Sequence, residues 1–160
     1  KHFPSLSLTE FQTRPTLGQP EWIEMYNPNG FAVNMSGWGL MRATGSSSAS
    51  VLFETGVIPG GGIGLYTGWE DLQESGNASF VVDLSESGML GVGTQDGLGD
   101  VAGTLAVTYA DTTTTATEVY SVSWNPTWRI GVGDSIVFLG GSHSDIGNWN
   151  LSSTPSPGDL

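Results

Sequence analysis

The stretch EWIEMYNPNG, residues 21–30, combines a strand pattern with a turn signal. Side chains alternate between the two faces of a strand, so Ile23 and Met25 share an apolar face while Trp22 and Glu24 share a mixed one. The NPNG end supplies turn residues, among them a proline that fixes φ. The stretch therefore predicts a β-strand that ends in a turn, and its two glutamates are candidates for a site.

Short strand patterns separated by turn residues continue along the chain. Leu6 and Leu8 alternate with serines, and Val122 and Trp124 share one face of a later segment. Helical periodicity is limited to residues 69–74, which are flanked by glycines. Further strands are expected at residues 23–27, 38–42, 51–53, 63–66, 80–84, 89–92, 105–109 and 134–139. The pattern predicts an all-β sandwich of roughly seven to ten short strands.

Composition limits the class of protein further. The chain has 160 residues, which is the size of one ordinary domain, so we expect a single domain over residues 1–160. Its 16 acidic and 4 basic residues give a net charge of −12, which repels nucleic acid and anionic membrane surfaces. The 6 tryptophans, 6 phenylalanines and 4 tyrosines need a core. We therefore expect a folded acidic domain without a nucleic-acid partner or membrane insertion.

The amino-acid composition also indicates in which cellular compartment the protein works. The chain has no cysteine, which excludes disulfides and thiolate metal sites. Scarce lysine, abundant glycine and serine, and surplus acid favour an extracellular or cell-surface location. Residues 1–4 run directly into strand-like sequence, so we expect that a leader was removed or that the chain is an excised domain.

Several motifs follow one another in a characteristic order. They are LTEF (8–11), EWIEMYN (21–27), NMSGWGL (34–40), FETGVIPGGG (53–62), NWN (148–150) and STPSPG (153–158). In this order they resemble the lamin-tail domain family, found at the end of nuclear lamins and in secreted or surface proteins of bacteria and archaea. The resemblance covers residues 5–67 and 148–158, and between them only Gly133-Asp134-Ser135 is similar to the family's late strand. It implies an immunoglobulin-like β-sandwich and a fold module rather than an enzyme class.

Three glutamates are candidates for a metal site. Glu10, Glu21 and Glu24 converge if the first two strands pair, and such a cluster is a candidate Ca²⁺ site. Calcium needs six to eight oxygen ligands, more than these side chains supply alone. The alternative is structural: a carboxylate on an exposed strand face, or one that accepts backbone N–H groups at a turn. Catalysis by such a pair would need a cleft and a raised pKa.

A second acidic segment is the loop DGLGD, which contains Asp96 and Asp100. It superficially resembles a calcium loop, so both aspartates are candidate ligands. It lacks the alternating Asp/Asn ligands and the final glutamate of an EF-hand. A solvated acidic loop is the alternative interpretation.

Four tryptophans are more than one sandwich core of this size usually hides: Trp69, Trp124, Trp128 and Trp149. Exposed tryptophans stack on sugar rings or anchor a protein partner. We list these four as candidate contacts with a glycan or a partner. Packing in the core or at its rim is the competing interpretation.

His143 lies in the segment GSHSD, where serine, histidine and aspartate are neighbours in sequence. A catalytic triad is a spatial arrangement, and no G-x-S-x-G motif supports one here. The other histidine is His2, so a histidine metal site also lacks partners. We predict a solvated loop.

Asn34, Asn77 and Asn150 each begin an N-x-S/T sequon. Asn34 lies in a turn that the fold uses for itself, which leaves Asn77 and Asn150 as candidate glycosylation sites. In a chain rich in serine and threonine, one or two such sequons arise by chance.

These observations favour a non-catalytic extracellular structural or interaction module. We expect it to act through strand edges and exposed aromatic side chains, with a protein partner or self-assembly. Donation of residues 1–11 to a neighbouring subunit is one form of self-assembly. The alternative is a glycan- or Ca²⁺-binding module accessory to a secreted enzyme. We predict no catalytic residues and no cofactor other than Ca²⁺.

Overall fold

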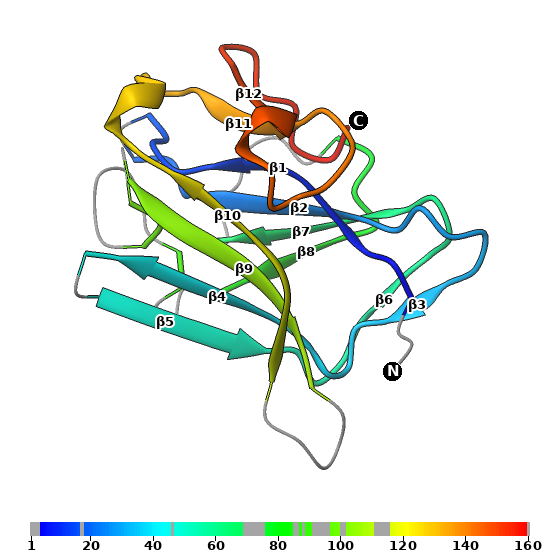
Figure 1. The fold of residues 1–160 in the computed structure, drawn as a ribbon. Coiled ribbons are helices and arrows are strands. Elements are labelled where there is room, and N and C mark those ends of the chain that lie inside the picture. Colours follow the sequence, from blue (N-terminus) through cyan, green and yellow to red (C-terminus); the bar gives the residue numbers. More distant parts are fainter. Residues whose placement is uncertain are drawn as a thin grey trace.

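Two β-sheets contain most of the strands of this protein (Figure 1). The computed structural model describes residues 4–16, 18–45, 47–68, 76–84, 87, 89–90, 97–99, 102–110 and 116–159. These residues form an all-β structure, which confirms the fold class predicted from the alternating sequence. Short 3₁₀ turns occur at Pro126–Trp128 and Ile146–Asn148.

The larger sheet has six strands in the order β12-β11-β1-β2-β7-β8. Its strands are β1 (Ser7–Gln12), β2 (Trp22–Tyr26), β7 (Ile63–Thr67), β8 (Phe80–Asp83), β11 (Ser135–Phe138) and β12 (Trp149–Ser152). Strands β7 and β8 are parallel, and the other neighbours in this sheet are antiparallel.

The smaller sheet has four antiparallel strands in the order β10-β9-β4-β5. Its strands are β4 (Trp38–Thr44), β5 (Ser47–Leu52), β9 (Gly103–Tyr109) and β10 (Thr117–Trp124). A separate ribbon pairs β3 (Val33–Asn34) with β6 (Val57–Ile58). Figure 1 shows the two sheets as facing layers.

The core lies between the sheets and follows the predicted alternation. On β2, Ile23 and Met25 point into the core, and on β4 Trp38 and Leu40 meet them from the smaller sheet. All four side chains are almost completely excluded from water. Burying a large apolar side chain contributes about 1.5–3 kcal/mol, so each of these four side chains stabilises the contact between the sheets.

Asn27 organises the turn that ends the EWIEMYNPNG stretch. Its buried side-chain amide donates hydrogen bonds to the carbonyl oxygens of Phe31, Ile58 and Pro59 at 2.8, 2.9 and 3.1 Å. Its Oδ1 accepts from the backbone N–H of Asn29 at 2.9 Å. One side chain thus satisfies backbone groups of two loops that are distant in sequence.

Gly37 explains why the Ser-Gly-Trp motif contains a glycine. Its φ of +92° belongs to the left-handed region, and a Cβ at this position would lie 2.5 Å from the carbonyl oxygen of Ala110. The sequence predicted such a close backbone approach beside Trp38, and the structure confirms it.

Several predictions of individual elements differ from the structure. Strands β3, β6 and β12 were not predicted, and Met89 and Leu90 are outside any strand. Strand β1 lies in the middle of its own sheet between β11 and β2. The idea that residues 1–11 are donated to a neighbour is therefore wrong for the strand itself. The predicted helical turn at residues 69–74 lies outside the described residues.

The sequence analysis predicted a domain without membrane insertion. Within the described part of the chain, no helix has both the length and the apolar character needed to span a bilayer.

Candidate functional site

Glu10 and Glu24 form a carboxylate pair on the face of the larger sheet that points away from the core. They are direct cross-strand partners on β1 and β2, and opposite side chains in an antiparallel pair have Cβ atoms about 5 Å apart. A β-bulge between Leu8 and Glu10 inserts Thr9 next to the pair. Both glutamates are buried. The predicted convergence of these two residues is therefore correct.

The C-terminal segment, residues 153–159, covers this pair. The backbone N–H and hydroxyl of Ser156 donate hydrogen bonds to Glu10 at 3.2 and 3.0 Å. Further along, Asn77 donates from its backbone to Gly158 and from its side chain to Asp159. The segment is thus attached both to the centre of the sheet and to the residues that precede β8.

The two carboxylates have different environments. Both oxygens of Glu10 accept hydrogen bonds, including one of 2.5 Å from the hydroxyl of Ser135. Glu24 accepts one side-chain bond, from the Thr9 hydroxyl to Oε1 at 2.9 Å. Its Oε2 is buried and has no hydrogen-bond partner. Such bonds stabilise an ionised carboxylate, so the protein stabilises a negative charge on Glu10 better than one on Glu24.

Burial raises the pKa of Glu24 from its ordinary 4.5 to about 7. The bond from Thr9 and the backbone of Gly158 lower this pKa, whereas the negative charges of Glu10 and Asp159 raise it. The neutral acid is therefore the form of Glu24 that fits its surroundings at mildly acidic pH.

Glu21 does not join the pair. It precedes β2 with the same parity as Ile23, on the core side of the strand, and its Oε1 accepts from the backbone N–H of Leu98 at 2.8 Å. The predicted convergence of three glutamates is thus wrong for this residue, because alternation turns Glu21 and Glu24 to opposite faces. The described residues contain no group of three acidic, histidine or cysteine side chains placed to hold a metal ion. Asp96 and Asp100 lie outside them.

The candidate tryptophans are mostly core residues. Trp124 and Trp149 are only 2% and 6% exposed, and both pack against Phe11. Their indole N–H groups donate to the carbonyl oxygens of Gly99 and His143. The prediction of exposed aromatic contacts is wrong for these two, because their strands turn them inward. Trp128 is half-buried against the core, and Trp69 lies outside the described residues.

His143 is not a freely solvated loop residue, contrary to our prediction. Its ring lies between Tyr120 and Phe138, with centroid distances of 4.0 and 3.9 Å and nearly parallel planes. Burial lowers the pKa of His143 from 6.5 to about 4. Asp145 is not its partner, since that side chain accepts from the backbone N–H of Gly147.

A different serine faces His143. The Ser7 hydroxyl and Nε2 of His143 are 2.9 Å apart beside a pocket of about 210 Å³. A general base works best when its pKa is near the working pH, and a ring with a pKa of about 4 is a weak base. The pair therefore fits a packing and hydrogen-bonding role better than nucleophile activation.

The two candidate glycosylation sites are both exposed. Asn150 lies in β12, and the Asn77 side chain donates to Asp159 at 2.8 Å. Asn34, as predicted, is used by its own turn, where Oδ1 accepts from the backbone N–H of Ser36. A glycan on Asn77 would compete with its bond to the C-terminal segment.

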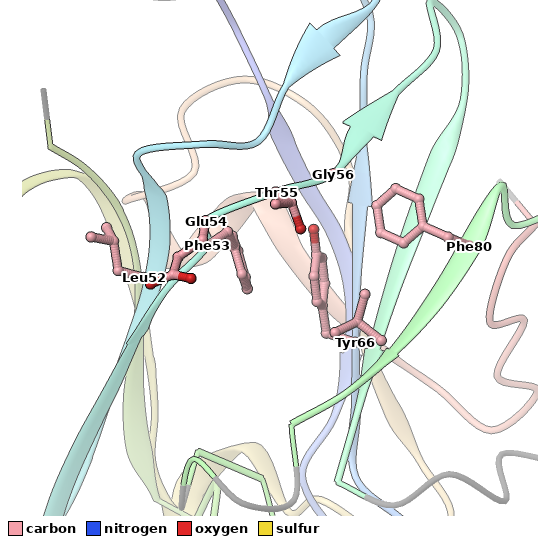
Figure 2. A pocket seen from close by; sticks show the side chains of 8 residues that line it. Leu52, Phe53, Glu54, Thr55, Gly56, Tyr66 and Phe80 are labelled. Atoms are coloured by element: carbon pink, nitrogen blue, oxygen red, sulfur yellow. The ribbon is translucent and has the colours of Figure 1, made fainter. Parts of the chain in front are cut away.

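A larger apolar groove lies at the open side of the sandwich, between the β5 and β8 edges. Its volume is about 510 Å³, and its lining consists of Leu52, Phe53, Glu54, Thr55, Gly56, Tyr66, Phe80 and Val82. Figure 2 shows residues 52–56 on one side of this groove, with Tyr66 and Phe80 facing them. The sequence did not predict the groove, because three separate segments build it and no local motif marks their meeting.

Edge strands flank this groove on both sides. Strand β5 ends the smaller sheet and β8 ends the larger one, and neither pairs with a further described strand. Natural edge strands are usually protected by lysine, proline or a bulge. Strand β5, with the sequence SSASVL, has neither charge nor proline. Its outer edge is therefore suited to pairing with another strand.

Two comparisons by sequence found no match for this chain. No protein-family model matches this chain, and no curated protein matches its sequence. The resemblance to lamin-tail domains therefore rests on the order of the sequence motifs.

Proposed function

We propose that this protein is a non-catalytic extracellular interaction module that binds an extended segment of a protein partner. The observation that carries the proposal is the position of the apolar groove between two sheet edges. A bound strand gains main-chain hydrogen bonds from an edge and specificity from a side-chain pocket. Both features occur together at the open side of this sandwich.

The groove has the size and chemistry for side chains of such a partner. Its volume of about 510 Å³ lies within the usual range of binding pockets. Phe53, Phe80 and Val82 supply apolar walls, and Leu52 at its rim is 51% exposed. Apolar side chains that alternate along an extended segment can enter the groove while its backbone pairs with β5.

The negative charge of this chain limits which partner segments it attracts. The chain carries a net charge of −12, and Glu54 lines the groove. A second copy of the chain brings the same negative charge, whereas a segment with lysine or arginine beside its apolar residues is attracted. We therefore infer a basic, apolar extended segment from a different protein as the occupant.

The alternative of a glycan-binding module has less support. Stacking on a sugar needs an accessible aromatic face, and Trp124 and Trp149 are buried. Tyr66 in the groove is 1% exposed and already stacks on Phe53. The extracellular location rests on composition and on the lamin-tail resemblance, which also implies an immunoglobulin-like module.

Selection of short linear peptides from a random display library on the purified protein tests the proposal. We expect enrichment of peptides that alternate apolar residues and contain lysine or arginine. Calorimetry should show binding to the wild type and a loss of at least about tenfold, or 1.4 kcal/mol, in Leu52→Arg. Val132→Arg, at a position 56% exposed and outside the groove, is the matched control.

Two results would overturn the proposal. One is a selection that enriches no peptide above a resin without protein. The other is equal binding to the Leu52 and Val132 variants, which would place the contact elsewhere. Amide exchange in β5 gives a second readout, because a paired strand protects the outward amides of this edge.

A further inference from the structure

A second cavity lies between the outer face of the larger sheet and the C-terminal segment. Its volume is about 170 Å³, and Glu10, Glu24, Ser156 and Asp159 are among its lining residues. Three carboxylates from three parts of the chain thus meet around one small space. The remaining lining residues are Thr9, Val137 and Phe138, so no basic side chain faces this cavity among the described residues.

Glu24 is the carboxylate of this cavity that has a buried oxygen without a hydrogen bond. It is 1% exposed, and its Oε2 has no hydrogen-bond partner. A buried carboxylate with one oxygen left without a hydrogen bond is costly to ionise, so Glu24 favours its neutral form. Glu10 differs because Ser135 and Ser156 stabilise its charge.

The C-terminal segment lies against this carboxylate and contributes Asp159 to the same cavity. Ser156 holds it to Glu10, and Gly158 and Asp159 are joined to Asn77. We propose that Glu24 is a pH-dependent latch: the neutral acid lets residues 153–159 lie on the sheet, and the carboxylate releases them.

Most groups around Glu24 support this direction, and the Thr9 hydroxyl and the Gly158 backbone, which lower its pKa, do not outweigh burial. Glu10 on β1 and Asp159 in the C-terminal segment repel a carboxylate at Glu24. The β7 residue opposite Glu24 is the apolar Leu65, and β11 contributes Val137 and Phe138 to the cavity. Ionisation therefore creates like-charge repulsion in a space without a described cation. Lifting the segment exposes the carboxylates to water and relieves the repulsion.

The sign of the pH dependence follows from the two states. With the segment closed, the pKa of Glu24 is raised to about 7, and with the segment open it returns towards 4.5. Closure is therefore fully favoured below pH 4.5 and weakens as the pH rises to about 7. One such proton changes the opening equilibrium by on the order of tens of fold across that window.

Amide hydrogen exchange measured by NMR at pH 5 and pH 7.5 tests the latch. After correction for intrinsic exchange, we expect the protection of the Ser156 and Asn77 amides to fall at least about tenfold at the higher pH. The Val107 amide in the central strand β9 should keep its protection. Glu24→Gln should abolish the pH dependence, and Glu54→Gln, outside this cavity, should preserve it.

Three outcomes would overturn the latch. They are equal protection of Ser156 at both pH values, the same fall in Glu24→Gln, and a fall shared by Val107, which would report global unfolding. Direct ¹³C titration of the Glu24 carboxyl in the wild type provides a test that needs no variant. A midpoint near 4.5 would also overturn it.

Discussion

Phe53 and Tyr66 stack across the open side of the sandwich, with ring centroids 4.6 Å apart and planes 16° from parallel. Phe53 follows β5 of the smaller sheet, and Tyr66 belongs to β7 of the larger one. The stack therefore joins the two sheets where no hydrogen-bonded strand does. Since the same rings line the groove, binding there and stability of the sandwich depend on shared residues.

Phe53→Ala should destabilise the protein by about 3–5 kcal/mol, the usual cost of removing a buried phenylalanine. The substitution removes both the stack with Tyr66 and a side chain that is 8% exposed. Urea unfolding followed by tryptophan fluorescence measures the change. Leu52→Ala, next in sequence but 51% exposed, should cost less than about 1 kcal/mol. Equal costs for the two variants would contradict a structural role of the stack.

Sequence reasoning succeeded where a pattern is local. Alternation in EWIEMYNPNG correctly placed Ile23 and Met25 in the core, and pairing of consecutive strands brought Glu10 to Glu24. The same alternation turns Glu21 away, but the proposed cluster disregarded this parity. The alternation of residues along a strand thus predicts which face of the sheet each side chain occupies, provided that it is applied to every residue.

Sequence reasoning failed where the outcome depends on distant segments. The number of tryptophans does not say which face they occupy, and Trp124 and Trp149 enter the core beside Phe11. The four residues of β12 become a strand because they pair with β11. The groove similarly depends on how β5 and β8 end on the same side of the sandwich.

Gly37→Ala should destabilise the protein by about 2–4 kcal/mol. The new Cβ would lie 2.5 Å from the backbone oxygen of Ala110, and the φ of +92° is already unfavourable for alanine. Gly45→Ala is the matched control, because Gly45 also has a positive φ but open space around its Cβ position. We expect only about 1–2 kcal/mol there. Thermal unfolding compares the two, and a similar loss in both would attribute the effect to backbone conformation alone.

Tyr120→Phe should cost about 1–3 kcal/mol. The Tyr120 hydroxyl accepts from the backbone N–H of Leu8 and donates to the carbonyl of Leu6, both at 2.8 Å. These groups adjoin the bulge in β1, so the hydroxyl replaces bonds that a regular strand would make. Chemical denaturation measures the loss. Tyr26→Phe, which removes a hydroxyl without a hydrogen bond to any described residue, should be nearly neutral.

His143 and Glu24 should act on stability with opposite signs in overlapping pH ranges. Folding lowers the pKa of His143 from 6.5 to about 4, so its contribution is complete above pH 6.5 and is lost as the pH falls to 4. Folding raises the pKa of Glu24 to about 7, so its contribution is complete below pH 4.5 and is lost as the pH rises to 7. The wild type should therefore show a weak net dependence across this range.

Single variants should separate the two contributions. Relative to the wild type, stability should fall more steeply on acidification in Glu24→Gln, because only the opposing histidine remains. In His143→Phe stability should instead rise on acidification, because only Glu24 of the two remains. The phenylalanine keeps a ring between Tyr120 and Phe138 but does not titrate. Urea midpoints at pH 7 and pH 4.5 provide the measurement. Parallel pH profiles of both variants and the wild type would show that neither residue changes its pKa on folding, because a pH dependence of stability requires such a change.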